Sequence, residues 1–147
     1  MSTSPSPTTP TPTAQVPPHR GQVQAIDLVN RIALIDGHWQ PRVVAEMNDY
    51  QFKVVKLLGE FQWHRHADTD ETFIVLDGEL EIDVRDGPSG GGTIVLRGGQ
   101  MAVIPRNVEH KPRAAAEVKL LLIEPRGVVN TGDGPADERT VANDQWI

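Results

Sequence analysis

The sequence predicts an all-β domain, an antiparallel sandwich or barrel. About eight short runs rich in β-branched and aromatic residues follow one another at spacings of about ten residues. Turn-forming pairs such as Asp77-Gly78 separate these runs. The chain of 147 residues is long enough for one such domain with its own hydrophobic core, and too short for two.

The N-terminal residues differ in composition from the rest of the chain. Residues 1–18 carry no charged side chain and hold six of the 12 prolines. Such a segment buries too little apolar surface to offset the entropy lost on ordering. We therefore expect residues 1–20 to form a disordered Pro/Ser/Thr-rich leader that aids solubility. Binding of a partner through a Pro-rich motif is the alternative.

The elements after the leader are predicted from periodicity and turn signals. Residues 24–33 predict a short helix, because Ile26, Val29 and Ile32 recur at three-residue spacing. All later elements are predicted as strands, and Asn48-Asp49 supplies turn chemistry between the first two. The predicted strands cover residues 42–47, 50–58, 60–66, 71–76, 79–84, 93–96, 100–104 and 118–124.

These elements divide the chain into a domain and two flanking segments. We expect residues 21–125 to form the barrel and residues 126–147 to form a polar C-terminal tail. The tail ends in Trp146-Ile147, which we expect to dock either on the chain's own barrel or on a partner subunit. Because small barrels expose sheet edges and an apolar face, we expect a homodimer, with residues 42–47 and Trp146-Ile147 as candidate contacts.

Composition excludes several classes of function. The chain has no cysteine, so thiolate catalysis, disulfides and Cys-type zinc sites are excluded. Its net charge of −6 argues against a nucleic-acid partner. No apolar run approaches the ~20 residues that span a bilayer, and no signal-peptide pattern is present. We therefore expect a cytoplasmic protein without a membrane partner.

Histidines with metal-ligand spacing lie in two short windows of the sequence. His64 and His66 are two residues apart on a predicted strand, so both side chains point to one face. Glu71 begins the next predicted strand, about 5 Å away across an antiparallel pair, and its carboxylate can reach the same ion. The second window, residues 98–110, ends in His110, which has little significance by itself.

Together the two windows resemble the two sequence motifs of the cupin family. The first motif is matched by Gly59, His64, His66, Glu71 and Gly78, with four residues instead of five between Gly59 and His64. The second is matched by Gly99, Pro105 and His110, but Asn107 stands where the family has Gly and Ala114 where it has Asn. Asn is the next-best residue for a left-handed turn, so we expect the backbone at Asn107 to keep the family's conformation.

The resemblance covers about residues 40–125 and implies a fold and a ligand set. It implies a single jelly-roll-like cupin barrel that binds one divalent metal ion through His64, His66, Glu71 and His110. Histidine and carboxylate ligands suit Fe, Mn, Ni, Zn or Cu, and the sequence does not select among them. A shift of the ligand from Glu71 to Asp70 stays open as an alternative.

Other side chains near these motifs are weaker candidates. Gln62 shares the face of His64 and His66, and Phe73 and Val75 share that of Glu71, so all three are candidates for lining a pocket; packing alone explains them equally well. A charged group around His110 either steers an acidic substrate or is a solvated rim, and we favour the rim. This group comprises Arg106, Glu109, Lys111 and Arg113. His19 and His38 have no partner at ligand spacing. Asp68 is expected to be a solvent-exposed loop residue and not a metal ligand.

The resemblance leaves the reaction open, because cupins include dioxygenases, isomerases, lyases and proteins without catalytic activity. We expect an enzyme that acts on a small oxygenated substrate through the metal, of the dioxygenase or of the isomerase or lyase type. The alternatives are a non-catalytic metal-dependent module that binds or senses a small molecule, and a structural barrel with a vestigial site. No residue outside the ligand set is an obvious general base.

Overall fold

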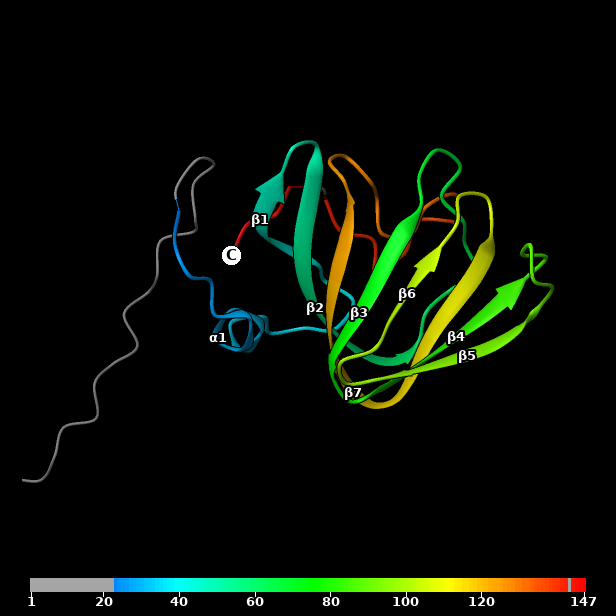
Figure 1. The fold of residues 1–147 in the computed structure, drawn as a ribbon, viewed down its shortest axis with the longest axis horizontal. Coiled ribbons are helices and arrows are strands. Elements are labelled where there is room, and N and C mark those ends of the chain that lie inside the picture. The colour runs from blue at the N-terminus through cyan, green and yellow to red at the C-terminus, as the bar shows by residue number, and fades with distance from the viewer. Residues whose placement is uncertain (1–22, 143) are drawn as a thin grey trace, which may run out of the picture.

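The computed structural model describes residues 23–142 and 144–147 of the chain. Within them, one short helix, α1 (Leu28–Ala33), precedes the strands. The strands are β1 (Arg42–Met47), β2 (Tyr50–Glu60), β3 (Glu71–Asp77), β4 (Glu79–Arg85), β5 (Gly92–Arg97), β6 (Met101–Ile104) and β7 (Glu109–Pro125). Their ladders are antiparallel, which confirms the predicted all-β class (Figure 1). The expected leader, residues 1–20, lies outside the described residues.

Strand β7 joins the two halves of the sheet. It pairs with β2 over most of its length, with β4 through residues 109–113, and with β3 through residues 119–123. One edge of β7 pairs with β2, and the other edge pairs first with β4 and then with β3. The path β1–β2–β7–β3–β6 and the β4–β5 hairpin are therefore joined through this one long strand, whose second neighbour changes half-way. This change of neighbour curves the sheet so that the strands surround a common interior (Figure 1).

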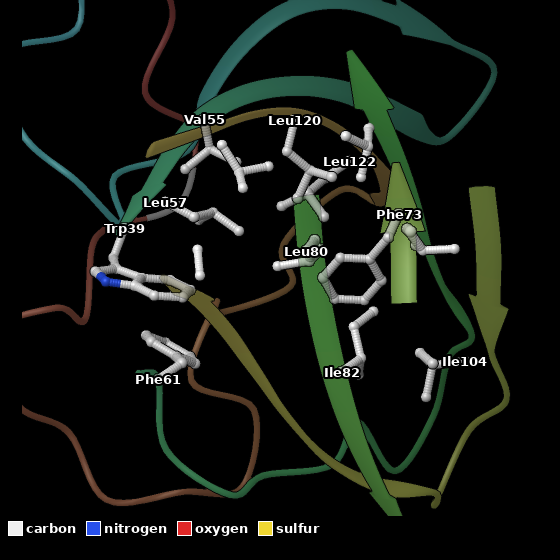
Figure 2. Packing of buried hydrophobic residues seen from close by; sticks show 14 of the residues in the cluster. Trp39, Val55, Leu57, Phe61, Phe73, Leu80, Ile82, Ile104, Leu120 and Leu122 are labelled. Atoms are coloured by element: carbon white, nitrogen blue, oxygen red, sulfur yellow. The ribbon is translucent and has the colours of Figure 1, made fainter. Parts of the chain in front are cut away.

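The interior holds the main hydrophobic core. Along β3, Glu71, Phe73 and Val75 are buried, whereas Thr72 and Ile74 between them are only partly covered, as the two-residue period of a strand requires. Figure 2 shows the interior cluster, to which strands β2, β3, β4, β6 and β7 all contribute. A second cluster, built on Ile32, Ile35, Val44 and Val54, packs α1 against the outer face of β1 and β2.

Three predicted elements differ from the structure by more than two residues. The predicted strand 60–66 is wrong: β2 ends at Glu60, and the segment that follows makes only an isolated bridge between His64 and His110. The predicted strand 118–124 is the last part of the 17-residue β7. The predicted helix 24–33 is shortened to α1, because Asp27 caps its N-terminus by accepting a hydrogen bond of 3.0 Å from the Asn30 amide.

The C-terminal Trp146-Ile147 docks on the chain's own barrel. Val43 of β1 donates a hydrogen bond to the Gln145 carbonyl (2.7 Å) and accepts one from the Ile147 amide (3.1 Å). Ile147 packs against the cluster beneath α1, and Figure 1 shows the C-terminus beside β1. None of the helices in the described part of the chain has the length and apolarity that a membrane crossing requires.

Candidate metal centre

Two backbone hydrogen bonds bring the two histidine motifs together. The His64 amide donates to the His110 carbonyl (3.1 Å), and the His110 amide donates to the His64 carbonyl (2.9 Å). This reciprocal pair places the two imidazole rings 4.4 Å apart, centroid to centroid. His64 therefore faces the interior through its bridge to β7, and not through the regular strand that its sequence predicts.

A left-handed turn secures the second motif to the first. Asn107 has φ +63°, so the expected left-handed backbone is present although Asn replaces the family's Gly. The amide of Asn107 donates to the His66 carbonyl at 2.9 Å. This bond fixes the backbone of His66 beside the turn that leads into β7, while Glu71 enters the interior from the first position of β3.

The four candidate ligands converge in the interior. One ligand atom from each of His64, His66, Glu71 and His110 lies within 4.8 Å of the other three. All four side chains are buried, and none is more than 7% exposed. Glu71 Oε2 lies 3.1 Å from His110 Nε2 and 3.3 Å from His66 Nε2. The structure thus assembles the residue set implied by the cupin resemblance.

Backbone carbonyls orient two of the three imidazoles. His64 Nδ1 donates to the Gln62 carbonyl (3.0 Å) and His110 Nδ1 donates to the Val108 carbonyl (2.9 Å). Since a carbonyl only accepts, each ring donates from Nδ1, and Nε2 is the nitrogen left to bind a metal; without a metal, His110 Nε2 lies within hydrogen-bond distance of Glu71 Oε2, at 3.1 Å. His66 Nε2 is buried and has no hydrogen-bond partner of adequate geometry among the described residues, despite its proximity to Glu71.

The electrostatics of the cluster favour neutral and anionic donors. Burial, and then the nearby His110, lower the pKa of His64 to about 4. Burial also opposes a charge on His66, but the Glu71 carboxylate outweighs it, so the pKa of His66 is raised. Burial by itself would raise the pKa of Glu71, but the adjacent imidazoles of His110 and His66 outweigh burial and hold this pKa well below the usual range. A carboxylate is therefore held ionised in the interior, next to at least one neutral imidazole.

This donor set fits a divalent metal ion. Neutral imidazole nitrogens and a carboxylate oxygen are ligands of Fe, Mn, Ni, Zn and Cu. The buried Nε2 of His66 without a hydrogen bond is the kind of orphaned atom that a metal would satisfy. Asp70, the alternative to Glu71, faces outward, where its carboxylate accepts from the Arg106 amide at 2.9 Å. Glu71 therefore matches the geometry of the cluster and Asp70 does not.

A cavity adjoins the cluster inside the barrel, and we call it the core cavity. His64 and Glu71 form one part of its wall. Its other lining includes Trp39, Leu57, Phe61, Phe73, Leu120 and Leu122. The volume of the core cavity is about 30 Å³.

The three predicted pocket residues occupy different positions. Phe73 lines the core cavity, and Val75 is fully buried in the interior cluster. The Gln62 amide is turned toward the C-terminal tail, where Nε2 donates to the Pro135 carbonyl at 2.9 Å.

The charged residues around His110 are paired with neighbours of opposite charge. Arg113 contacts Asp83 and Glu81, and Lys111 lies 3.5 Å from Glu60. Arg106 and Glu109 contact Asp70 and Arg85, respectively. His38 lies 2.8 Å from Glu117 at the surface, away from the cluster, and His19 is outside the described residues.

Sequence reasoning missed most of the wall of the core cavity, above all Trp39, Phe61 and Asn130. Trp39 and Phe61 stack with their ring centroids 4.7 Å apart, and Asn130 of the C-terminal tail completes the wall. Trp39 lies before β1 and Asn130 after β7, and neither belongs to a motif. The one available signal was the isolated tryptophan in a Gly-His-Trp-Gln turn. A large aromatic side chain is stabilised by burial, so a tryptophan in a turn is expected to pack against another part of the fold.

Comparison with known proteins places the fold and the motifs in one family. Residues 54–124 match the Cupin domain family. A cupin-2 domain protein of Shewanella frigidimarina has a solved structure that is 55% identical, covers 69% of this chain and 94% of its own, and superposes with a TM-score of 0.64. The uncharacterised Bacillus subtilis protein YdbB is 37% identical over 81 residues, which are 55% of this chain and 68% of YdbB. The chain belongs to the cupin family.

A more distant likeness concerns the fold alone. Hydroquinone 1,2-dioxygenase from Sphingomonas sp. TTNP3, solved in complex with 4-nitrophenol, is 23% identical and has a TM-score of 0.64. The match covers 80% of this chain but 38% of the dioxygenase chain.

Proposed function

We propose that this cupin is a metal-dependent enzyme acting on a small oxygenated substrate, of the dioxygenase or of the isomerase or lyase type. The observation that carries the proposal is the position of the core cavity, whose wall includes two of the four candidate ligands, His64 and Glu71. A buried metal site whose ligands are shared with a cavity has room for an exogenous ligand, which distinguishes catalytic from structural sites.

The roles of the protein groups follow from their surroundings. His64, His66, His110 and Glu71 would hold the ion, which when bound supplies Lewis acidity and one or two open positions for oxygen donors. The apolar wall of the core cavity excludes water from the reacting atoms. Proton transfer by the chain itself is confined to the ligand set, because no other acidic or basic side chain lines this cavity among the described residues.

The distant likeness to hydroquinone 1,2-dioxygenase shows that the same fold serves a dioxygenase. The likeness does not extend from the fold to the reaction of this chain. The second candidate function is a non-catalytic module that binds or senses a small molecule through the metal. It is favoured by the same absence of a further acid or base in the described wall of the cavity. The homodimeric state and the cytoplasmic location stay predictions from the sequence.

The first prediction concerns metal content. We expect about one divalent ion per chain in protein purified without a histidine tag. His64→Ala and His110→Ala should lose most of it, because each removes one of four converging donors. His38→Ala and Asp70→Asn are matched controls on exposed side chains and should retain the ion. Elemental analysis of folded protein, verified by circular dichroism, makes the measurement. Equal content in all variants would refute the site.

Turnover separates the two candidate functions. Metal-loaded protein should consume oxygen, or isomerise or cleave a member of a panel of small oxygenated molecules, and the His110→Ala variant should not. A panel in which molecules bind to the metal-loaded protein but none is converted would support the sensing module.

A further inference from the structure

The wall of the core cavity is apolar apart from the candidate ligands and one amide. Its lining side chains in the described chain number twelve, of which nine are hydrocarbon or aromatic. The other three are His64, Glu71 and Asn130. Polar groups that a substrate could meet are therefore limited to the metal end of the cavity and to the amide of Asn130.

The polar atoms of Asn130 and Trp39 are already engaged within the protein. Asn130 Nδ2 donates to the Arg139 carbonyl (2.7 Å) and lies 3.4 Å from the Trp39 carbonyl, and Asn130 Oδ1 accepts from the Val141 amide. Trp39 Nε1 donates to the Leu58 carbonyl at 2.9 Å. A substrate therefore meets the ring of Trp39 without its N–H group, and an amide whose donors and acceptor have partners.

Trp39 is held in place against a backbone cost. Its φ of +61° lies in the left-handed region, which bulky residues rarely adopt. Its amide donates to the Lys56 carbonyl at 2.9 Å, and its ring stacks on Phe61 at an interplanar angle of 21°. Strain of this kind persists where surrounding contacts fix one geometry, often at ligand sites. Figure 2 shows this stacked pair and Phe73 on opposite sides of the interior cluster.

We propose that the substrate is a compact molecule with a flat apolar body, a single aromatic ring, and its oxygen donors at one end. The inference rests on the proposed function, because the donors must meet the metal. Hydroxyl, phosphate or ammonium groups on the body would lose their water without gaining a partner in this wall, which costs binding free energy. The wall therefore disfavours sugars, sugar phosphates and dicarboxylates whose second polar end would face it.

The small size of the cavity favours a compact body. Its volume is about 30 Å³, so a single ring enters only when side chains of the wall shift. A fused-ring system would require a larger shift, which favours one ring over two.

Three hydroxamates test this inference, because they share one metal-binding group and differ in the body. Acetohydroxamate carries a methyl group, benzohydroxamate a phenyl ring, and gluconohydroxamate a polyhydroxyl chain. On zinc-loaded full-length protein, calorimetry should show benzohydroxamate binding at least about tenfold more tightly than acetohydroxamate, because the ring buries apolar surface. Gluconohydroxamate should bind no more tightly than acetohydroxamate.

Variants locate the binding in the core cavity. Leu57→Phe fills the cavity and should remove the preference for the phenyl ring while leaving acetohydroxamate binding within about twofold. Phe61→Leu removes one ring of the stacked pair and should reduce the preference less severely. Ile104→Val is the matched control, since Ile104 is buried in the same cluster and lines a different groove. It should change neither affinity.

The outcomes separate the two levels of the proposal. Equal affinity for benzohydroxamate and acetohydroxamate, or tighter binding of gluconohydroxamate, overturns the substrate class and leaves the metal centre intact. A phenyl preference that survives Leu57→Phe also overturns it, because the ring then binds elsewhere. If the protein takes up no zinc, the proposed function is refuted, and the inference about the substrate is refuted with it.

Discussion

At the scale of single residues, His64 and His66 respond to burial in opposite ways. The pKa of His64 is lowered to about 4 by burial and by its neighbour His110. The pKa of His66 is raised, because the Glu71 carboxylate 3.3 Å away outweighs its burial. Of these two ligands, His66 holds a proton more tightly, whereas His64 is already neutral near pH 7.

These shifts have opposite effects on the metal-free protein. Between pH 6.5 and about 4 the unfolded chain protonates His64 and the folded chain does not, so His64 lowers stability as the pH falls through that window. His66 contributes stability that is complete below pH 6.5 and is lost as the pH rises through its raised pKa. Metal binding and protonation thus compete more strongly at His66 than at His64.

The second prediction follows from this competition. The gain in melting temperature that a metal provides should be present at pH 8, decline below about pH 7, and be absent by about pH 4.5. The decline should begin at a higher pH than for free imidazole, because Glu71 stabilises the protonated form of His66. Paired thermal melts with and without metal between pH 4 and 8 make the measurement. A gain that is unchanged at pH 4.5 would exclude histidine ligation.

The cluster could be predicted from the sequence while the cavity wall could not. His64, His66, Glu71 and His110 are recognisable because their spacing in two short windows is specific. The side chain of His64 is nevertheless oriented by a bridge to His110 and not by the regular strand that the sequence predicts. Trp39 and Asn130 meet only after the chain has folded around the barrel, and no local pattern relates residues 91 positions apart.

At the scale of elements, β2 and β7 enclose a buried ion pair. Lys53 Nζ lies 2.8 Å from Glu124 Oε1, and the two side chains are 5% and 1% exposed. Burial, and then the charge of Glu71, raise the pKa of Glu124 to about 7, although Lys53 opposes the shift. Glu124 Oε2 has no hydrogen-bond partner among the described residues. The contacts of the pair therefore offset only part of the free-energy cost of burying two charges. Lys53 is the group that lowers the cost of burying the Glu124 carboxylate.

The third prediction is that this pair is fragile when broken from one side. Lys53→Met should destabilise the fold by about 3 kcal/mol, because it leaves a buried carboxyl group without its partner. The double variant Lys53→Met/Glu124→Leu should recover most of that loss, since an apolar pair of similar volume fits a buried site. Urea unfolding at pH 8, where Glu124 is more ionised, measures both.

Arg97→Ala is the control for the third prediction. It removes an exposed ion pair with Glu79, in which both side chains are more than half exposed, and should cost less than about 1 kcal/mol. A Lys53→Met variant as stable as the control would show that Glu124 is protonated and needs no partner.

The long strand β7 explains why element boundaries were harder to predict than element types. Its second half, VKLLLIE, has the apolar composition of a strand and was predicted as one. Its first half contains Pro112 among charged residues, which argues against a strand in a sheet interior. The structure places Pro112 opposite Ile82 of β4, and the Pro112 carbonyl accepts from the Phe61 amide at 2.9 Å. The start of β7 is therefore decided by its pairing with β4, which the sequence does not reveal.

At the scale of the whole molecule, the sheet has open edges. Among the described residues β5 pairs only with β4, and β6 pairs only with β3. Met101 and Val103 of β6 are more than half exposed. The edge of β1 is partly covered by residues 145–147 of the same chain, so the expected contact through Trp146-Ile147 competes with this intrachain docking.

The fourth prediction is a homodimer, because unpaired apolar edges are stabilised by association. Light scattering at micromolar concentration should give twice the chain mass of 16.1 kDa. Met101→Lys/Val103→Lys places charges on the open edge of β6 and should shift the mass toward that of the monomer. A monomer mass for the unmodified chain would contradict the prediction.

The last prediction compares the two ends of the chain. Deleting residues 1–18 should change the melting temperature little, because their composition provides almost no apolar surface for a core. Deleting residues 145–147 should lower it by several degrees. That deletion removes two backbone hydrogen bonds to Val43 and the contacts of Ile147 with the cluster beneath α1. Thermal melts of both truncations against the full chain measure the contrast. A large fall after the N-terminal deletion would show that the leader is docked, and a C-terminal deletion without effect would show that Trp146-Ile147 contributes nothing to the stability of the barrel.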